Sequence, residues 1–494
     1  MKKIKIGWGE RSLVPEGRKV NLAGQFYERI SDEVESDISA TALAISDGDE
    51  AVIFCSADLG GVGTKLVRMV RERLSGSGIP TDKLIINATH VHTAPAFDAV
   101  TDLFGGVSTA LLQRLLPDAE YEPLAKYEGE DLIIGAEASE HLASRIAEAV
   151  IEAWNNLSEG YFTTAFGRAA VGMCRRVSYD DGTSLMWGDS HLASFTELEG
   201  GNDSGIEMLF TYDKAKRLTG VIANVACPAQ VLEHRSFISS DYFGKVKEIL
   251  REKYGAELKL LGLVSPAGDQ CPRDLVRWVE PETPINDPNI IRNNPPRRKS
   301  DPSMFDLSGC RLIGKRIANE IIWALEEADG LTDEAVLMHK TELFDLPLRR
   351  ATISEYENAL SAITDFREES RARRINYIDK ARMHIHAGTI ARFELQKEIQ
   401  SVTVELHFVR LGNIAFATNP FELFLDYANR IRAMSPAEQT FLIQLCSGSF
   451  GYLPTEKAEA RGHYSAYISS GVTGHDGGDM LVRKTLSEIT EFFK

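Results

Sequence analysis

The sequence lacks most features that would assign a protein to a class at once. Its 494 residues contain no apolar run of the ~18 residues that a membrane span needs. The segment after Lys2 and Lys3 is too polar for an export signal, so we expect a cytoplasmic protein. Positive charge is also in deficit, because 72 Asp and Glu oppose 55 Lys and Arg and leave a net charge of −17. This balance argues against a general nucleic-acid binder.

Paired cysteines and nucleotide-binding fingerprints are missing as well. The six cysteines stand singly, without Cys-x-x-Cys spacing, and indicate reduced thiols. A glycine-rich stretch at 58–65 leads from a strand into a helix, a setting that can bind phosphate. It lacks the residue order of the P-loop and of G-x-G-x-x-G. An enzyme that binds phosphate or a nucleotide through residues 60–65 therefore stays a third hypothesis.

What the sequence does contain is an irregular alternation of strand and helix patterns. Apolar runs on either side of a short polar turn predict β-hairpins over 40–56 and 402–418. Further strands are predicted at 84–87, 161–167, 207–212, 218–226 and 258–264. Helical spacing predicts helices at 64–74, 139–154, 242–254, 312–327, 421–434 and 478–493, and a solvated helical hairpin at 354–382. The pattern favours an α/β fold with mixed sheets, interrupted by a long proline-rich loop at 274–304 that suits a lid or a surface excursion equally well.

His90 and His92 stand at the end of the strand predicted at 84–87. Residues two apart in an extended chain point to the same side, so both imidazoles can project together from a strand's carboxyl end. Two neutral imidazoles in this arrangement suit a divalent cation such as zinc. On spacing alone, a pair of hydrogen-bonded surface histidines is the favoured alternative.

Four further side chains are candidates for chemistry. Cys271 follows a Gly-Asp turn and can be a nucleophile, a ligand or a buried inert thiol, and Cys227 can ligate zinc or simply fill the core. Glu422 opens a predicted helix, where the helix dipole alone explains a carboxylate. Tyr452 lies in a turn rich in Gly and Pro, and packing alone explains it.

The order of these pieces resembles the neutral, non-lysosomal ceramidases. The block Asn-Ala-Thr-His-Val-His-Thr-Ala-Pro at 87–95 resembles that family's Ala-Thr-His-Thr-His-Ser-Gly-Pro. Four weaker matches occur in the family's order between Ile53 and Asp476: Ser240-Asp241-Tyr242 with Ser-Asp-Asn, 268–272 with Gly-Asp-Val-Ser-Pro, 420–422 with Pro-Gly-Glu, and 451–455 with Tyr-Val/Ile-Thr-Thr.

The resemblance implies a zinc amidase on a mixed α/β catalytic domain that spans residues 1–494. It makes His90, Glu422 and Tyr452 zinc ligands. His92 would hydrogen-bond the region of the scissile amide, where Tyr452 also acts. Arg175 falls where the family has a substrate-binding arginine.

Two departures from the family pattern concern the site itself. The family's second zinc histidine aligns with Cys227, so the fourth ligand is either this cysteine or His234 a few residues on. The serine of Gly-Asp-Val-Ser-Pro is Cys271, next to Asp269, and its thiol can bind metal, be oxidised or fill the serine's volume.

The family's C-terminal immunoglobulin-like domain and its export signal are not expected here, which argues against ceramide as the substrate. We therefore expect a zinc-dependent hydrolase of the C–N amide bond in a small N-acyl molecule. A homo-oligomer is compatible with the sequence. The alternative is a binding protein that keeps the ceramidase fold and has lost activity.

Overall fold

The structure is a computed structural model that describes the chain except for residues 26, 32, 99–101, 103–108, 123–126 and 278–305. Nearly all of the loop predicted at 274–304 therefore lies outside the described residues. Within the described part, no helix is both long enough and apolar enough to cross a membrane.

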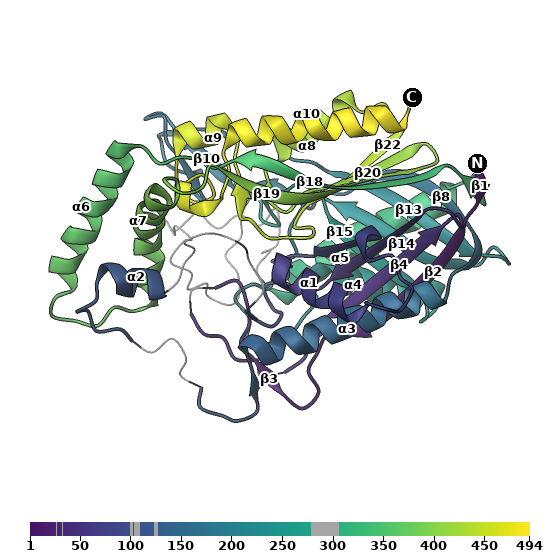
Figure 1. Ribbon diagram of the computed structural model, residues 1–494, viewed down its shortest axis with the longest axis horizontal. Coiled ribbons are helices and arrows are strands. Elements are labelled where there is room, and N and C mark those ends of the chain that lie inside the picture. The colour runs from purple at the N-terminus through teal and green to yellow at the C-terminus, as the bar shows by residue number, and fades with distance from the viewer. Residues whose placement is uncertain (26, 32, 99–101, 103–108, 123–126, 278–305) are drawn as a thin grey trace.

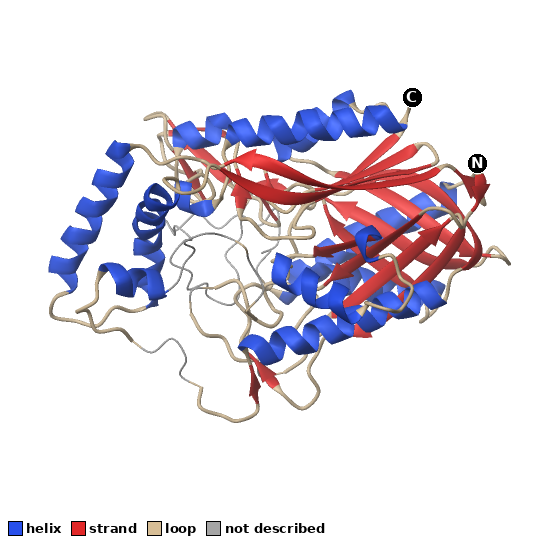
Figure 2. Cartoon of the chain, viewed as in Figure 1, coloured by secondary structure: helices blue, strands red, loops and turns tan. Residues whose placement is uncertain are grey.

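Two sheets stack face to face, and helices cover both outer faces, so the molecule has four layers (Figures 1 and 2). The larger sheet is mixed, because its outer pairs β14–β15 and β5–β6 are parallel and its central pairs are antiparallel. Its eight strands are, in spatial order, β15 (Lys259–Val264), β14 (Leu218–Val225), β13 (Gly205–Asp213), β8 (Ser158–Arg168), β2 (Lys5–Ser12), β4 (Ser39–Ser46), β5 (Ala51–Ala57) and β6 (Leu84–Ala88).

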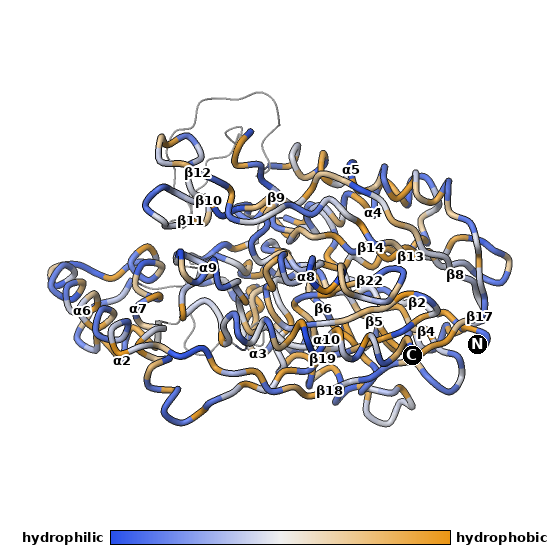
Figure 3. Tube along the Cα trace, turned by 90° about the horizontal axis from the view of Figure 1, so that it is seen from above, coloured by the Kyte–Doolittle hydropathy of each residue, from blue (hydrophilic) through white to orange (hydrophobic). Residues whose placement is uncertain are grey.

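The smaller sheet packs on the larger one through aromatic and aliphatic side chains. Its four strands are β18 (Leu337–Pro347), β19 (Ser401–Leu411), β20 (Ile414–Thr418) and β22 (Gln439–Ile443). The ring of Phe54 lies 4.9 Å from that of Phe416, which stacks on Phe441 at 4.5 Å. Both faces of each sheet are covered, and apolar side chains fill the space between the layers, where orange stretches of the chain run through the middle of Figure 3.

Helices on the outer faces use apolar stripes of helical spacing. On α1, Leu66, Val67 and Val70 are buried against the larger sheet. The larger sheet is covered by α1 (Thr64–Arg73), α3 (Gly135–Asn155), α4 (Asp241–Tyr254) and α5 (Leu307–Glu327), and the smaller sheet by α8 (Leu425–Met434) and α10 (His475–Phe492).

A separate group of helices lies at one end of the molecule, at the left of Figure 1. It comprises α2 (Thr109–Leu115), α6 (Ile353–Ser370) and α7 (Tyr377–Leu395). The predicted helical hairpin is confirmed, and Thr352 and Asn376 begin its two helices with capping boxes. Its inner face is buried rather than solvated, because Ile363, Phe366 and Met383 share one apolar cluster.

Both predicted hairpins are confirmed, as β4–β5 and β19–β20. The helix predicted from residue 421 is wrong at its start. Residues Glu422–Leu423 form a short strand, β21, that pairs in parallel with β23 (Tyr452–Leu453), and α8 begins only at Leu425. Pairing with β23 therefore overrides the helical pattern at these positions.

The remaining elements are short and form the connections between the layers. They are β1 (Lys2–Lys3), β3 (Lys19–Val20), β7 (Leu132–Ile133), β9 (Met173–Cys174), β10 (Arg176–Tyr179), β11 (Ser184–Met186), β12 (Phe195–Leu198), β16 (Gln270–Cys271), β17 (Glu334–Ala335), α9 (Glu456–Arg461) and the 3-10 turns Thr81–Lys83 and Ile468–Ser470.

Candidate active site

The candidate site lies where loops that follow several strands meet. His90 follows β6, Cys227 follows β14 and Gly268 follows β15, each shortly beyond the carboxyl end of its strand. The amide of Gly268 donates to the carbonyl of Leu423 in β21 (2.9 Å), which ties the loop after β15 to the segment after β20. Ligands of open α/β sheets bind at this edge.

The imidazoles of His90 and His92 converge, with 3.3 Å between their Nε2 atoms. His90 has φ = 66°, a left-handed conformation that costs free energy in a residue other than glycine and concentrates at functional sites. This turn, and not the alternation of an extended strand, brings the two rings together, so the predicted pairing arises from a different backbone geometry.

His90 is held as a neutral imidazole with a defined tautomer. Burial lowers the pKa of His90 to about 3. Its Nδ1 lies 2.7 Å from the carbonyl oxygen of Gly60, which can only accept, so Nδ1 carries the proton. The Nε2 lone pair therefore points into the site.

Glu422 reaches the same point from β21. Its Oε2 lies 3.5 Å from His90 Nε2, and the β21–β23 register places Glu422 directly beside Tyr452, whose hydroxyl donates to the carboxylate. Burial raises the pKa of Glu422 in spite of the nearby Arg175 and the Tyr452 hydroxyl. The prediction that a helix dipole accounts for this carboxylate is wrong, because Glu422 precedes α8.

Arg175 supplies the positive charge nearest to this carboxylate. It is buried between β9 and β10, and its Nη2 donates to the Gly268 carbonyl (2.9 Å) and to the Tyr452 hydroxyl (3.2 Å). The same nitrogen lies 3.9 Å from Glu422 Oε2. Trp187 packs against the guanidinium, with its ring centroid at 5.7 Å, and nothing in the sequence pattern had indicated that residue.

A second buried carboxylate, Glu233, joins two of the histidines. Its oxygens lie 3.2 Å from His92 Nδ1 and 3.2 Å from His234 Nε2. Burial alone raises the pKa of Glu233, but hydrogen bonds from His234 and His92 outweigh burial and hold the pKa well below its ordinary range. Glu233 was not among the predicted site residues, and the sequence indicated it only by its position next to His234.

The two cysteines of the site are buried thiols. Cys227 Sγ lies 3.5 Å from the carbonyl of Pro228, and Cys271 Sγ donates to the Arg273 carbonyl (3.2 Å). Burial raises the pKa of Cys271 to about 12 and that of Cys227 well above its ordinary value. A protonated thiol is a poor nucleophile and a poor metal ligand, so this arrangement favours a packing role for both.

Asp269 anchors the segment that carries Glu422. Its Oδ1 accepts from the amide of Leu425 at the start of α8 (2.9 Å), and its carbonyl accepts from the amide of Arg175 (2.9 Å). Burial raises the pKa of Asp269 to about 6. The structure thus places Asp269 as a support for Glu422 and Arg175.

The Asp269→Asn variant should flatten the dependence of stability on pH. Because the folded-state pKa of about 6 lies above the ordinary 3.8, folded Asp269 holds its proton longer than the unfolded chain does. The native protein therefore loses stability as pH rises from about 4 through 6, by roughly 3 kcal/mol for this carboxyl. Urea unfolding of both proteins between pH 4 and 7 measures the difference. An unchanged slope in the variant would contradict the assignment.

Gly268→Ala should disrupt the site through the backbone. A Cβ at this position would lie 2.2 Å from the carbonyl oxygen of Glu422, so β21 must shift and carry the carboxylate away from His90. Gly60→Ala is the matched control, because its Cβ would meet only ordinary contacts of 3.5 Å. We expect circular dichroism and thermal melting to show a lower Tm for Gly268→Ala, by several degrees, and a nearly unchanged Tm for Gly60→Ala.

The glycine-rich loop is arranged unfavourably for phosphate. The carboxylate of Asp102 accepts from the amide of Thr64 (2.9 and 3.1 Å) and from its hydroxyl (2.6 Å) at the start of α1. A negative charge therefore already occupies this helix N-terminus. The carbonyl oxygen of Gly60, in the same loop, accepts a hydrogen bond from His90 Nδ1.

Three side chains of the site suit a small divalent cation. Ligand atoms held tetrahedrally at about 2.0–2.1 Å from zinc lie roughly 3.3–3.4 Å apart, close to the 3.5 Å between His90 Nε2 and Glu422 Oε2. A neutral imidazole, a carboxylate and the phenol of Tyr452 are suitable donors. Among the described residues, no group of three or more His, Cys, Asp or Glu side chains is arranged so that it could hold a metal ion as it stands.

The fold, with two stacked mixed sheets between helical layers, is similar to that of solved ceramidase structures. The chain matches the crystal structure of a neutral ceramidase from Pseudomonas aeruginosa with a TM-score of 0.67 and 15% sequence identity, over 100% of this chain and 75% of that chain. A ceramidase complexed with C2 matches with a TM-score of 0.67 and 12% identity, over 100% and 76%.

No protein-family model and no curated protein sequence matches the chain. The structural likeness therefore establishes the fold, and the α/β fold that the sequence motifs predicted is confirmed.

Proposed function

We propose that the chain is a zinc-dependent hydrolase that cleaves the C–N amide bond of a small N-acyl substrate. The observation that carries the proposal is the convergence of His90, Glu422, Tyr452 and Arg175 at one buried point of a ceramidase fold. These side chains come from four distant segments of the chain, and packing alone does not require them to meet.

His90 and Glu422 would hold the ion, with Tyr452 beside them. When bound, zinc lowers the pKa of a bound water towards neutrality and polarises the amide carbonyl. A buried carboxylate whose pKa is raised by desolvation gains most from a nearby cation, which is the situation of Glu422.

Arg175 and Tyr452 would stabilise the charge that develops on the substrate. The Arg175 guanidinium fixes the Tyr452 hydroxyl at 3.2 Å, and both donors are held before any substrate binds. Donors preorganised in a buried site are worth more than in water, because nothing needs to reorient as the oxyanion forms. This arrangement suits acyl transfer to water.

Metal analysis combined with turnover tests the proposal. The purified protein is assayed on a panel of N-acyl substrates, namely ceramides, fatty-acid amides and N-acyl amino acids, before and after chelation and after zinc is restored. We expect hydrolysis of at least one class, lost on chelation and recovered with zinc.

His90→Ala should abolish both metal binding and turnover. His384→Ala is the matched control, since His384 is a buried histidine on the distant helix α7. Zinc-bound protein that cleaves no amide would contradict the proposal and support a binding protein with the ceramidase fold.

A further inference from the structure

We propose that His92, oriented by Glu233, is the second histidine ligand of the zinc in place of Cys227. The inference concerns this chain's own departure from the ceramidase motif, and it rests on the zinc component of the proposed function.

The two Nδ1 atoms face acceptors. His90 Nδ1 meets the Gly60 carbonyl at 2.7 Å, and His92 Nδ1 meets Glu233 Oε2 at 3.2 Å. A carboxylate oxygen at this distance accepts a hydrogen bond from an imidazole N–H. Both Nδ1 atoms therefore carry protons, and in neutral imidazoles both Nε2 atoms carry lone pairs.

The two Nε2 atoms lie 3.3 Å apart, so with these tautomers their lone pairs face each other. Two acceptors at this distance repel unless a positive charge lies between them. A zinc ion supplies that charge, and the separation is that of two nitrogens bound tetrahedrally to one ion. The other source of positive charge is a proton, which would make His92 an imidazolium that donates to His90.

Cys227 is poorly placed to be the ligand. Its thiol faces its own neighbour, the Pro228 carbonyl, and its side chain belongs to the main apolar cluster under the larger sheet. Its backbone is also fixed, since its carbonyl accepts from the Tyr242 hydroxyl at 2.5 Å.

Glu233 would act as the carboxylate behind a metal-bound histidine. Such a partner fixes the tautomer and the direction of the imidazole and raises its basicity, and removing it typically weakens metal binding by about 10–100-fold. Glu233 is a positioning residue in this scheme, and its second oxygen is held by His234.

X-ray absorption at the zinc edge tests the inference on the unmodified, zinc-loaded chain. We expect scattering from two imidazoles and no sulfur at about 2.3 Å. A zinc–sulfur distance, or scattering from a single imidazole, would overturn the proposal. Protein that binds no zinc, with His92 protonated against His90, would overturn it as well.

Zinc affinities of variants provide the second readout, measured by competition with a chromophoric chelator. We expect Cys227→Ser to bind zinc as the natural chain does, Glu233→Gln to bind it about 10–100-fold more weakly, and His92→Asn more weakly still. Circular dichroism of the metal-free variants shows whether each one folds. Unchanged affinity in His92→Asn would contradict the ligand assignment.

The two proposals fail separately. If zinc binds through His92 and no amide is cleaved, the hydrolase proposal fails and the ligand assignment stands. If hydrolysis depends on zinc that is held by the Cys227 sulfur, the ligand assignment fails and the hydrolase stands.

Discussion

Glu422→Gln should lower zinc-dependent turnover by at least about 10³-fold while leaving the metal-free fold as stable as before. A carboxamide is a weak zinc ligand, and losing the ion removes several kcal/mol of transition-state stabilisation. Stability should be retained because burial raises the pKa of Glu422, so the folded chain gains nothing from its charge. Steady-state kinetics with zinc and thermal melting after chelation measure the two effects.

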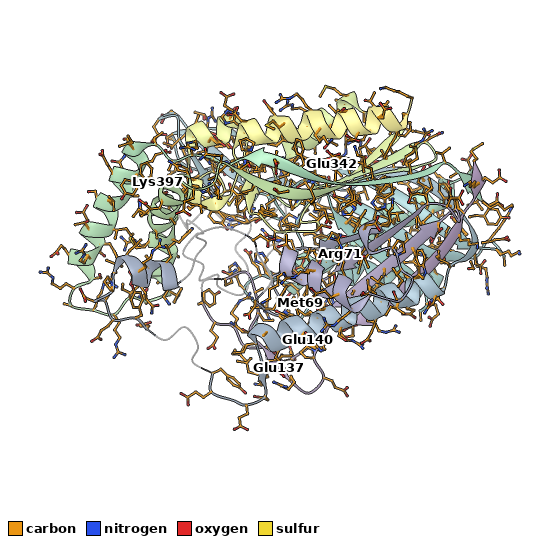
Figure 4. All side chains as sticks on the ribbon, in the orientation of Figure 1. Met69, Arg71, Glu137, Glu140, Glu342 and Lys397 are labelled. Carbon is orange, nitrogen blue, oxygen red and sulfur yellow. The ribbon has the colours of Figure 1, made fainter. Side chains whose placement is uncertain are left out.

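Glu405→Gln is the matched control and should behave in the opposite way. Glu405 is also largely buried, but Arg71, labelled on α1 in Figure 4, binds both of its oxygens at 2.7 Å, and His407 Nε2 lies at 2.8 Å. Burial opposes these contacts, but they hold the pKa of Glu405 well below its ordinary range. We expect Glu405→Gln to lower stability and leave turnover per folded chain unchanged. Equal losses of turnover in both variants would contradict the special role of Glu422.

Arg175→Ala should reduce both stability and turnover. It removes the donor to Gly268 and Tyr452 and leaves the carboxylate of Glu422 buried without its nearest cation. Each buried acceptor left without its donor costs about 1–3 kcal/mol, and losing one preorganised donor typically lowers kcat by about 10²–10³-fold. Urea unfolding of the chelated protein and kcat of the zinc-loaded protein measure the two losses.

A control variant at the neighbouring Arg176 distinguishes a loss of stability from a loss of turnover. It is fully buried, and its guanidinium is paired with Glu199 and donates to the Gly462 carbonyl (2.8 Å). Arg176→Ala should therefore cost a similar amount of stability and leave kcat of the folded protein within a few-fold. A comparable fall in kcat in both variants would show that Arg175 acts only through the fold.

The parts of the site that depend on local sequence were predictable. The spacing of His90 and His92 after an apolar strand, and the Gly-Asp turn before Cys271, are local patterns, and the structure places all of them at one edge of the larger sheet. Hairpins and amphipathic helices were predictable for the same reason, because hydrophobic period and turn residues are local.

Contacts between distant segments were not predictable. The β21–β23 pairing joins residues 422 and 452, and it turned an expected helix start into a strand. The contact between Glu233 and His92 forms only because the loop after β14 meets the loop after β6. The packing of Cys227 in the core likewise depends on the whole fold. A residue's position in the sequence cannot report such packing.

The most direct test of the proposed function is hydrolysis of an N-acyl substrate measured against bound zinc. Metal-free protein is titrated with zinc, and turnover is plotted against the zinc retained per chain. We predict that turnover rises in proportion to bound zinc and stays at background in His90→Ala. Turnover that is independent of zinc, or full zinc binding with no cleavage of any N-acyl substrate, would contradict it.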